Sequence, residues 1–287
     1  MSHFSIAGLQ LASSCGNNLD RMGAEITKCK KRFPWLDMLV LGELCSFGPE
    51  KKYAETLPGP SEVYFQTLAK ELNVWLIPGS LYEKLDDKIY NTTSVINNHG
   101  EVVCRYRKLF PFYPYEKDVE CGNEFVVFDV PQGRIGVAIC YDLWFPEVAR
   151  SLASQGAEVL IYPTMTGTID RDIEVTMAKA TAATNQCYVI AINTVGELGN
   201  GQSVFVGPRG ECIYQAGNQE EFIPIEIDFA HVRRNRERGL HNLGQPLKSF
   251  RDNKLNYPCY QPDSRLSELD KLGKLAMPDK DLNNLDQ

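Results

Sequence analysis

The chain has 287 residues, 43% of them hydrophobic and 23% charged, and a net charge of -7 at pH 7. This length fits one large α/β domain or two smaller ones, with enough apolar residues for a sizeable core. Acidic and basic residues are interspersed, which argues against a nucleic-acid-binding protein. No apolar run approaches the ~20 residues that span a bilayer, so we expect a small molecule as the partner, with no nucleic acid and no membrane.

Cysteine and histidine usage points to a reducing compartment without a metal site. The nine cysteines are scattered and contain no C-x-x-C pair, which is not the pattern of a disulfide framework and predicts a cytoplasmic protein. The apolar N-terminal stretch lacks a basic leader, so it predicts a strand rather than a signal peptide. The four histidines are too far apart for a common metal-ligand spacing, and no metal is expected.

The first 81 residues alternate between predicted strands and helices, which is the pattern of repeated βα units. Apolar residues at helical spacing predict one helix capped by Asn17 or Asn18 and a second helix capped by Ser61. The predicted elements are strands over Phe4–Leu11, Met38–Leu41 and Val74–Leu81, and helices over 19–33 and 58–73.

Beyond residue 90 the predicted strands are joined by hairpin turns as well as by helices. The turn sequences NNHGE, PQG and PRGE are rich in residues that favour tight turns. The predicted strands are 90–96, 102–106, 125–130, 134–139, 158–162, 188–193, 203–207, 212–214 and 222–227, and the predicted helices are 146–155 and 170–185. Crossovers together with hairpins indicate mixed sheets. We therefore expect an α/β fold with two mixed sheets face to face and helices outside, a four-layer αββα sandwich.

The regular pattern weakens after Phe229. Residues 249–262 are irregular, and residues 263–287 are mostly charged. We expect one folded domain over 1–262 and a C-terminal tail over 263–287 that is either mobile or docked on a partner subunit.

The segment RIGVAICYDLWFPEVAR, residues 134–150, places a cysteine between a strand and a helix. An apolar strand leads directly into Cys140, and Pro146 is suited to open the helix that follows. The partial positive charge of a helix start favours the thiolate, which is the nucleophilic form. The alternative is that Cys140 is a buried structural residue, as most free cysteines are.

Two other apolar strands also end in an ionisable residue, Glu43 and Lys108. If these strands lie in one sheet with the strand before Cys140, the three side chains meet at one edge. A glutamate there can move the thiol proton to a leaving amine, and a lysine can stabilise an oxyanion. The backbone N–H of Tyr141 is the second predicted oxyanion donor. The three residue types together favour acyl transfer.

Three segments resemble the signature segments of the nitrilase superfamily of carbon–nitrogen hydrolases, in the same order. They are LGELC around Glu43, YRKLFPFYPYE from Tyr106 to Glu116, and GVAICYDLWFPEVAR around Cys140. The resemblance extends from Phe4 to about Ile227, so the domain over 1–262 is expected to be a carbon–nitrogen hydrolase domain. It implies an αββα sandwich, commonly dimerised, and a Glu–Lys–Cys triad without metal or cofactor at Glu43, Lys108 and Cys140. A homodimer or higher homo-oligomer is therefore expected.

Glu116 is a fourth candidate catalytic residue. Its spacing of eight residues from Lys108 resembles the amidase and formamidase branches, in which a second glutamate orients substrate and water; otherwise it is a surface glutamate. Gly42 stands where many members have proline, and the long C-terminal extension of those branches is missing. The run DLWFPE instead resembles N-carbamoyl-amine hydrolases.

The predicted function is hydrolysis of a small non-peptide amide to a carboxylic acid and ammonia through an acyl-enzyme on Cys140. The alternatives are an N-carbamoyl-amine amidohydrolase, a non-catalytic binding or assembly module of the same fold, and a redox-sensing thiol. Tyr141, Tyr113 and Trp144 are the predicted substrate-binding residues. The segment Thr164–Thr168 is expected to be ordinary loop.

Overall fold

The computed structural model describes residues 2–113, 115–261 and 267–275. Most of the predicted tail, residues 263–266 and 276–287, lies outside the described residues. Among the helices of the described part, none combines the length and apolar character that crossing a bilayer requires.

The first sheet is mixed and has seven strands. In order they are β15 (Glu221–Asp228), β1 (His3–Gln10), β3 (Met38–Leu41), β4 (Trp75–Ile77), β6 (Lys88–Ile96) and β5 (Leu81–Leu85), with β7 (Val102–Arg107) also paired to β6. Strands β1, β3 and β4 are parallel to one another, whereas β15 pairs antiparallel with β1, and β6 pairs antiparallel with β4, β5 and β7. The predicted strand Val74–Leu81 is wrong as one element, because Pro78 and Gly79 separate β4 from β5.

The second sheet is mixed and has six strands. Their order is β14 (Cys212–Gln215), β13 (Val204–Val206), β11 (Tyr188–Asn193), β10 (Val159–Thr164), β9 (Gly133–Val137) and β8 (Val126–Val130). Strands β9, β10 and β11 are parallel, so their carboxyl ends lie at one edge. A short parallel pair, β2 (Ala12–Ser13) and β12 (Val195–Gly196), was not predicted from the sequence.

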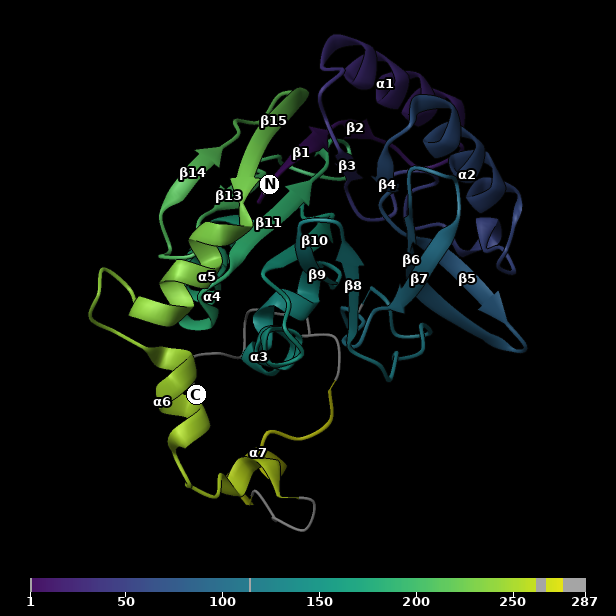
Figure 1. The fold of residues 1–287 in the computed structure, drawn as a ribbon. Coiled ribbons are helices and arrows are strands. Elements are labelled where there is room, and N and C mark those ends of the chain that lie inside the picture. Colours follow the sequence, from purple (N-terminus) through teal and green to yellow (C-terminus); the bar gives the residue numbers. More distant parts are fainter. Residues whose placement is uncertain (1, 114, 262–266, 276–287) are drawn as a thin grey trace.

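Helices cover the outer face of each sheet (Figure 1). Against the first sheet pack α1 (Leu19–Arg32) and α2 (Pro60–Leu72), and against the second pack α3 (Pro146–Ser154) and α4 (Arg171–Asn185). The alternation along β1 and β3 shows the layering, since Phe4 and Met38 join the core between the sheets while Leu9 and Leu39 join the core under α1 and α2. The predicted four-layer αββα sandwich is thus confirmed.

The two sheets approach closely where β1 crosses β11. A side chain at Gly8 would collide with Ile192 of the other sheet, so only glycine allows this packing distance. Side chains from both sheets fill the rest of the interface as one buried apolar cluster. The strand ends that build the site described below are therefore held by a rigid core.

Two details of the helices differ from the sequence predictions. Ser61 does not cap α2, because Gly59 holds the cap position and Pro60 opens the helix; the Ser61 hydroxyl instead donates a hydrogen bond of 2.5 Å to Glu55. At α1, Asn18 is the cap residue, but it is the Asn17 side chain that accepts a hydrogen bond from the Leu19 N–H, at 2.9 Å.

The segment after β15 is more ordered than its sequence pattern indicates. It forms α5 (Phe229–Arg238), α6 (Pro246–Asp252) and α7 (Ser267–Asp270). Phe229 and Val232 anchor α5 in the core between the sheets, whereas α6 and α7 lie at the lower end of the view in Figure 1, away from both sheets. Three short 3-10 helices complete the described elements: η1 (Lys51–Tyr53), η2 (Cys140–Trp144) and η3 (Pro258–Tyr260).

Candidate active site

The predicted site residues come from both sheets and meet where the two sheets face each other. Glu43 follows β3 and Lys108 follows β7 in the first sheet, whereas Cys140 follows β9 in the second. The expectation that all three strands lie in one sheet is therefore wrong. The backbone N–H of Glu43 donates a hydrogen bond to the Thr164 carbonyl at the end of β10, at 3.1 Å, and so joins the two strand edges.

A buried ion-pair cluster occupies the floor of the site. The Lys108 Nζ donates to Glu43 Oε1 and to Glu116 Oε2, each at 2.7 Å. All three side chains are nearly inaccessible. The structure thus shows Glu116 inside the cluster and not on the surface. Two of the three ammonium protons are committed to carboxylates, and one is left for another acceptor.

Asn91 completes this cluster and was missed by the sequence analysis. Its Nδ2 donates to Glu43 Oε1 and to Glu116 Oε1, each at 2.8 Å, and its backbone carbonyl accepts from the Lys108 backbone N–H at 2.8 Å. Asn91 lies within β6, and asparagine is depleted in strand interiors. An asparagine in an otherwise strand-forming run was the one available sequence signal.

Cys140 is the first residue of η2 and lies at a sharp bend shortly after β9. Its φ of 45° is in the left-handed region, which few residues other than glycine adopt. Helix α3 begins at Pro146, as predicted from the sequence, whereas the 3-10 helix η2 that precedes it was not predicted. The bend is held by Asp142, whose Oδ2 accepts from the Ile139 N–H at 2.9 Å.

Asp142 also connects this bend to the segment that carries Lys108. The carboxylate accepts hydrogen bonds from the Tyr106 hydroxyl at 2.7 Å and from the Phe110 N–H at 2.9 Å. Burial raises the pKa of Asp142 to about 6, although these hydrogen bonds act in the opposite direction. Asp142 therefore fixes the relative position of the cysteine and the lysine.

Burial dominates the proton affinities of the cluster. It raises the pKa of Glu43 above its ordinary value, and the Lys108 charge only partly opposes this. Burial alone would lower the pKa of Lys108, but the facing carboxylates of Glu43 and Glu116 outweigh it and raise that pKa well above the ordinary range. The lysine is therefore a permanent cation at neutral pH.

The thiol of Cys140 is neutral in the resting site. Burial raises its pKa well above the ordinary value, and the carboxylates of Glu43 and Glu174 add to the shift, while Lys108 opposes it. The expectation of a favoured thiolate is therefore wrong for this state, because burial and two carboxylates raise the thiol pKa and the helix begins only six residues later. A neutral thiol needs a base to become a nucleophile.

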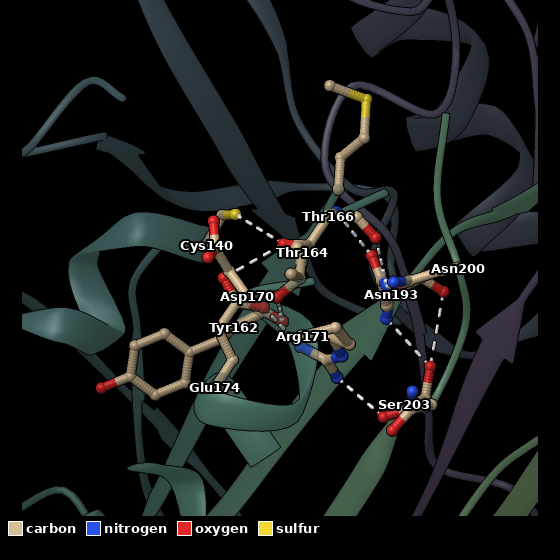
Figure 2. A network of polar contacts seen from close by, with 12 residues as sticks. Cys140, Tyr162, Thr164, Thr166, Asp170, Arg171, Glu174, Asn193, Asn200 and Ser203 are labelled. Carbon is tan, nitrogen blue, oxygen red and sulfur yellow. Dashed lines mark hydrogen bonds and ion pairs between the residues drawn. The ribbon is translucent and has the colours of Figure 1, made fainter. Parts of the chain in front are cut away.

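A second polar network lies on the other side of the cysteine (Figure 2). Cys140 Sγ is 3.7 Å from the Thr166 hydroxyl, which donates to Glu174 Oε1 at 3.1 Å. Arg171 pairs with the other oxygen of Glu174 at 3.0 Å. The Thr166 N–H donates to Asn193 Oδ1 at 2.8 Å, which ties this loop to the end of β11.

A cavity of about 290 Å³ opens in front of the four candidate catalytic residues. Of the predicted substrate-binding residues, Tyr141 and Trp144 line it, but Tyr113 does not, and its neighbours Phe112 and Tyr115 do. Residues Met165 to Thr168, expected to be ordinary loop, also line the cavity. Among the described residues no group of histidine, cysteine and acidic side chains is arranged to hold a metal ion.

Comparison with known proteins is consistent with this geometry. A family model described as carbon-nitrogen hydrolase matches residues 6–237. The chain is 32% identical over 219 residues to the omega-amidase NIT2-A of Xenopus laevis, covering 67% of this chain and 78% of that protein.

Two solved structures share the fold at similar levels of sequence identity. Nit3 of Saccharomyces cerevisiae, described as a member of branch 10 of the nitrilase superfamily, has a TM-score of 0.76 and 29% identity, covering 82% of this chain and 94% of that one. A carbon-nitrogen hydrolase from Helicobacter pylori G27 has a TM-score of 0.76 and 25% identity, covering 88% and 96%.

Proposed function

This chain belongs to the carbon–nitrogen hydrolase family of the nitrilase superfamily, and we propose that it hydrolyses a small non-peptide amide through a thioester on Cys140. It is a hydrolase of the amidase type. The observation that carries the mechanism is the buried cluster of Glu43, Lys108 and Glu116 beside a neutral thiol at the floor of one cavity.

The first half of the proposed reaction forms the acyl-enzyme. Glu43 takes the thiol proton as Cys140 Sγ attacks the amide carbon, and the carbonyl π electrons move to oxygen. The uncommitted N–H of Lys108 and the backbone N–H of Tyr141 stabilise that oxyanion. When the tetrahedral intermediate collapses, the C–N bond breaks, the nitrogen takes the proton from Glu43, and ammonia leaves.

The second half releases the acid. Glu43 takes a proton from water as the water oxygen attacks the thioester carbon, and the C–S bond then breaks with return of the proton to sulfur. Glu116 supports both halves by holding Lys108 and Asn91 in place, at 2.7 and 2.8 Å, and by orienting substrate and water.

Three sequence-based expectations accompany this proposal. The cysteines of the described chain are free thiols, which supports the cytoplasmic location expected from the sequence. We further propose a homodimer or higher homo-oligomer, which light scattering on the purified protein tests. The extent of the hydrolase domain, 1–262, is tested by whether a protein ending at residue 262 retains activity.

The function is tested by incubating the protein with amides, N-carbamoyl amines and nitriles of matched size and measuring ammonia. We expect release from amides and its loss in Cys140→Ala, together with an acyl adduct on Cys140 in the mass spectrum of the quenched wild-type enzyme. Turnover that survives in Cys140→Ala would eliminate the mechanism.

An N-carbamoyl amine is the second candidate substrate, favoured by the run DLWFPE after Cys140. Its hydrolysis gives amine and carbon dioxide in addition to ammonia, so amine detection distinguishes it from a simple amide. A non-catalytic module predicts no ammonia from any member of the panel. A redox-sensing thiol predicts oxidation at Cys140 under mild peroxide without turnover.

A further inference from the structure

The charges that line the cavity are strongly unbalanced. Among the described residues around it, Lys108 is the single cationic side chain, and its charge is already paired with Glu43 and Glu116. Three more carboxylates line the cavity beyond this cluster, those of Asp170, Glu174 and Glu197. The proposed mechanism uses none of these three.

The negative charge of Glu174 is balanced by Arg171, a buried residue that does not line the cavity. Its Oε1 accepts from Thr166 at 3.1 Å and from the Trp144 Nε1 at 3.4 Å, and its Oε2 accepts from Arg171 at 3.0 Å. Arg171 is 1% exposed and does not line the cavity. Its Nε and Nη2 donate to the backbone carbonyls of Gly201 and Gln202, at 3.2 and 2.8 Å. The guanidinium therefore balances Glu174 without offering a cation to a bound ligand.

The carboxylates of Asp170 and Glu197 are not paired with a cationic side chain of the described residues. Neither forms an ion pair within the described part of the chain, and the Asp170 Oδ2 accepts only a neutral hydrogen bond from Thr168 at 3.2 Å. Asp170 is half-buried immediately before α4, and Glu197 is exposed after β12. Two carboxylates without a cationic side-chain partner at the wall of a cavity attract cations and repel anions.

The aromatic side chains of the cavity also favour a cationic ligand. Phe112, Tyr115, Tyr141 and Trp144 all contribute to its lining. The negative face of an aromatic ring attracts a cation, most strongly for tryptophan. Carboxylates and rings in one cavity are thus the complement of an alkylammonium group.

We propose that the substrate is a short amide carrying a cationic amine, and that Asp170 and Glu197 select it by charge. This rests on the proposed function, because the amide carbonyl must lie at Cys140. We call the carboxylates of Asp170 and Glu197 the acidic wall. Asp170 stands immediately before α4, the helix that carries Glu174, and Thr166 links Glu174 to the sulfur, lying 3.7 Å from Cys140 Sγ and 3.1 Å from Glu174 Oε1. Amides with about three carbons between carbonyl and amine are therefore used as probes.

The test compares three amides with four carbons each: 4-aminobutyramide (cationic), butyramide (neutral) and succinamate (anionic). In the wild type we expect kcat/KM to fall in that order, with a cation-to-anion ratio of ~100 at low salt that decreases as salt screens the wall. In the double variant Asp170→Asn, Glu197→Gln this ratio should fall about tenfold or more, because both charges are lost while side-chain shape is kept. Glu71→Gln, an exposed change on α2, is the matched control and should leave the ratio unchanged.

A binding measurement distinguishes failure of the charge selection from failure of the proposed function. Cys140→Ala removes the nucleophile but keeps the acidic wall, so calorimetry should show tighter binding of 4-aminobutyramide than of succinamate. If no amide is hydrolysed but this preference in binding is found, the proposed function fails and the charge selection stands. Equal or tighter binding of succinamate, equal or faster turnover of it, or a ratio unchanged in the double variant would overturn the charge selection.

Discussion

The ion-pair cluster at the floor of the site makes a strong prediction for Lys108→Met. The substitution keeps the volume and removes the ammonium that two buried carboxylates contact at 2.7 Å. Breaking a buried ion pair costs about 3–5 kcal/mol, because it leaves a buried charge without compensation. We expect the free energy of unfolding, measured by urea denaturation at pH 8, to fall by about that amount. Lys88→Met is the control, since Lys88 forms an exposed pair with Glu120 at 3.4 Å and should cost less than ~1 kcal/mol.

The decrease in the free energy of unfolding caused by Lys108→Met should become smaller as the pH falls. Burial already raises the pKa of Glu43 in the folded wild type, and removing Lys108 raises it further. A group whose folded pKa exceeds its unfolded pKa contributes stability that is present below the unfolded value and is lost as pH rises through the folded value. The variant should therefore recover stability between pH 8 and pH 5 relative to the wild type.

Neutralising Glu43 provides the internal check of this explanation. Glu43→Gln in the Lys108→Met background removes one unpaired charge, so it should restore part of the stability at pH 8 but little at pH 5. A Lys108→Met protein within ~1 kcal/mol of the wild type at pH 8, a range typical of exposed pairs, would refute the reasoning.

Three further predictions test the bend, a close approach and the base. Asp142→Asn should lower the free energy of unfolding by about 2–4 kcal/mol in urea denaturation, because its amide cannot accept from all three donors that face the buried carboxylate; a loss under ~1 kcal/mol would contradict this role. Gly79→Ala should lower the free energy of unfolding by about 3 kcal/mol in the same assay. Gly79 has a φ of 79°, and a Cβ there collides with the Gly42 carbonyl next to Glu43. Gly217→Ala is the control, because the space around Gly217 is open. The acid limb of the kcat/KM–pH profile should lie above the ordinary glutamate value of 4.5, because the ionised Glu43 is the active form and burial raises its pKa; a limb at or below 4.5 would exclude Glu43 as the base.

The strand ends could be predicted because their signals are local. Glu43, Lys108 and Cys140 each terminate a short apolar run, and the motifs around them resemble one family in one order. Their convergence was predicted, but the single sheet that was expected to bring them together was wrong. Sheet membership depends on which strands pair, and pairing joins residues that are far apart in the chain.

The supporting residues could not be predicted because their partners are distant. Asn91 contacts Glu43 across 48 positions, and Tyr106 contacts Asp142 across 36. Neither contact leaves a periodic pattern in the sequence. The prediction that Ser61 caps α2 was wrong because Pro60 favours the first helical position, which places Ser61 inside the helix. The full span of helix α5 was not predicted because only a few of its residues, among them Phe229 and Val232, are buried.

The positions of the acid and the thiol explain how a resting neutral site can still react. Burial raises the pKa of Cys140 and that of Glu43 together, so the two proton affinities shift in the same direction. The free-energy cost of transferring the proton between them depends on the difference of the two values and not on either alone. Lys108 lowers both, and its cation then faces the thiolate and the oxyanion that form in the proposed reaction. In this arrangement, excluding water strengthens the interaction of Lys108 with the developing negative charge, while the thiol stays protonated and unreactive until a substrate occupies the cavity.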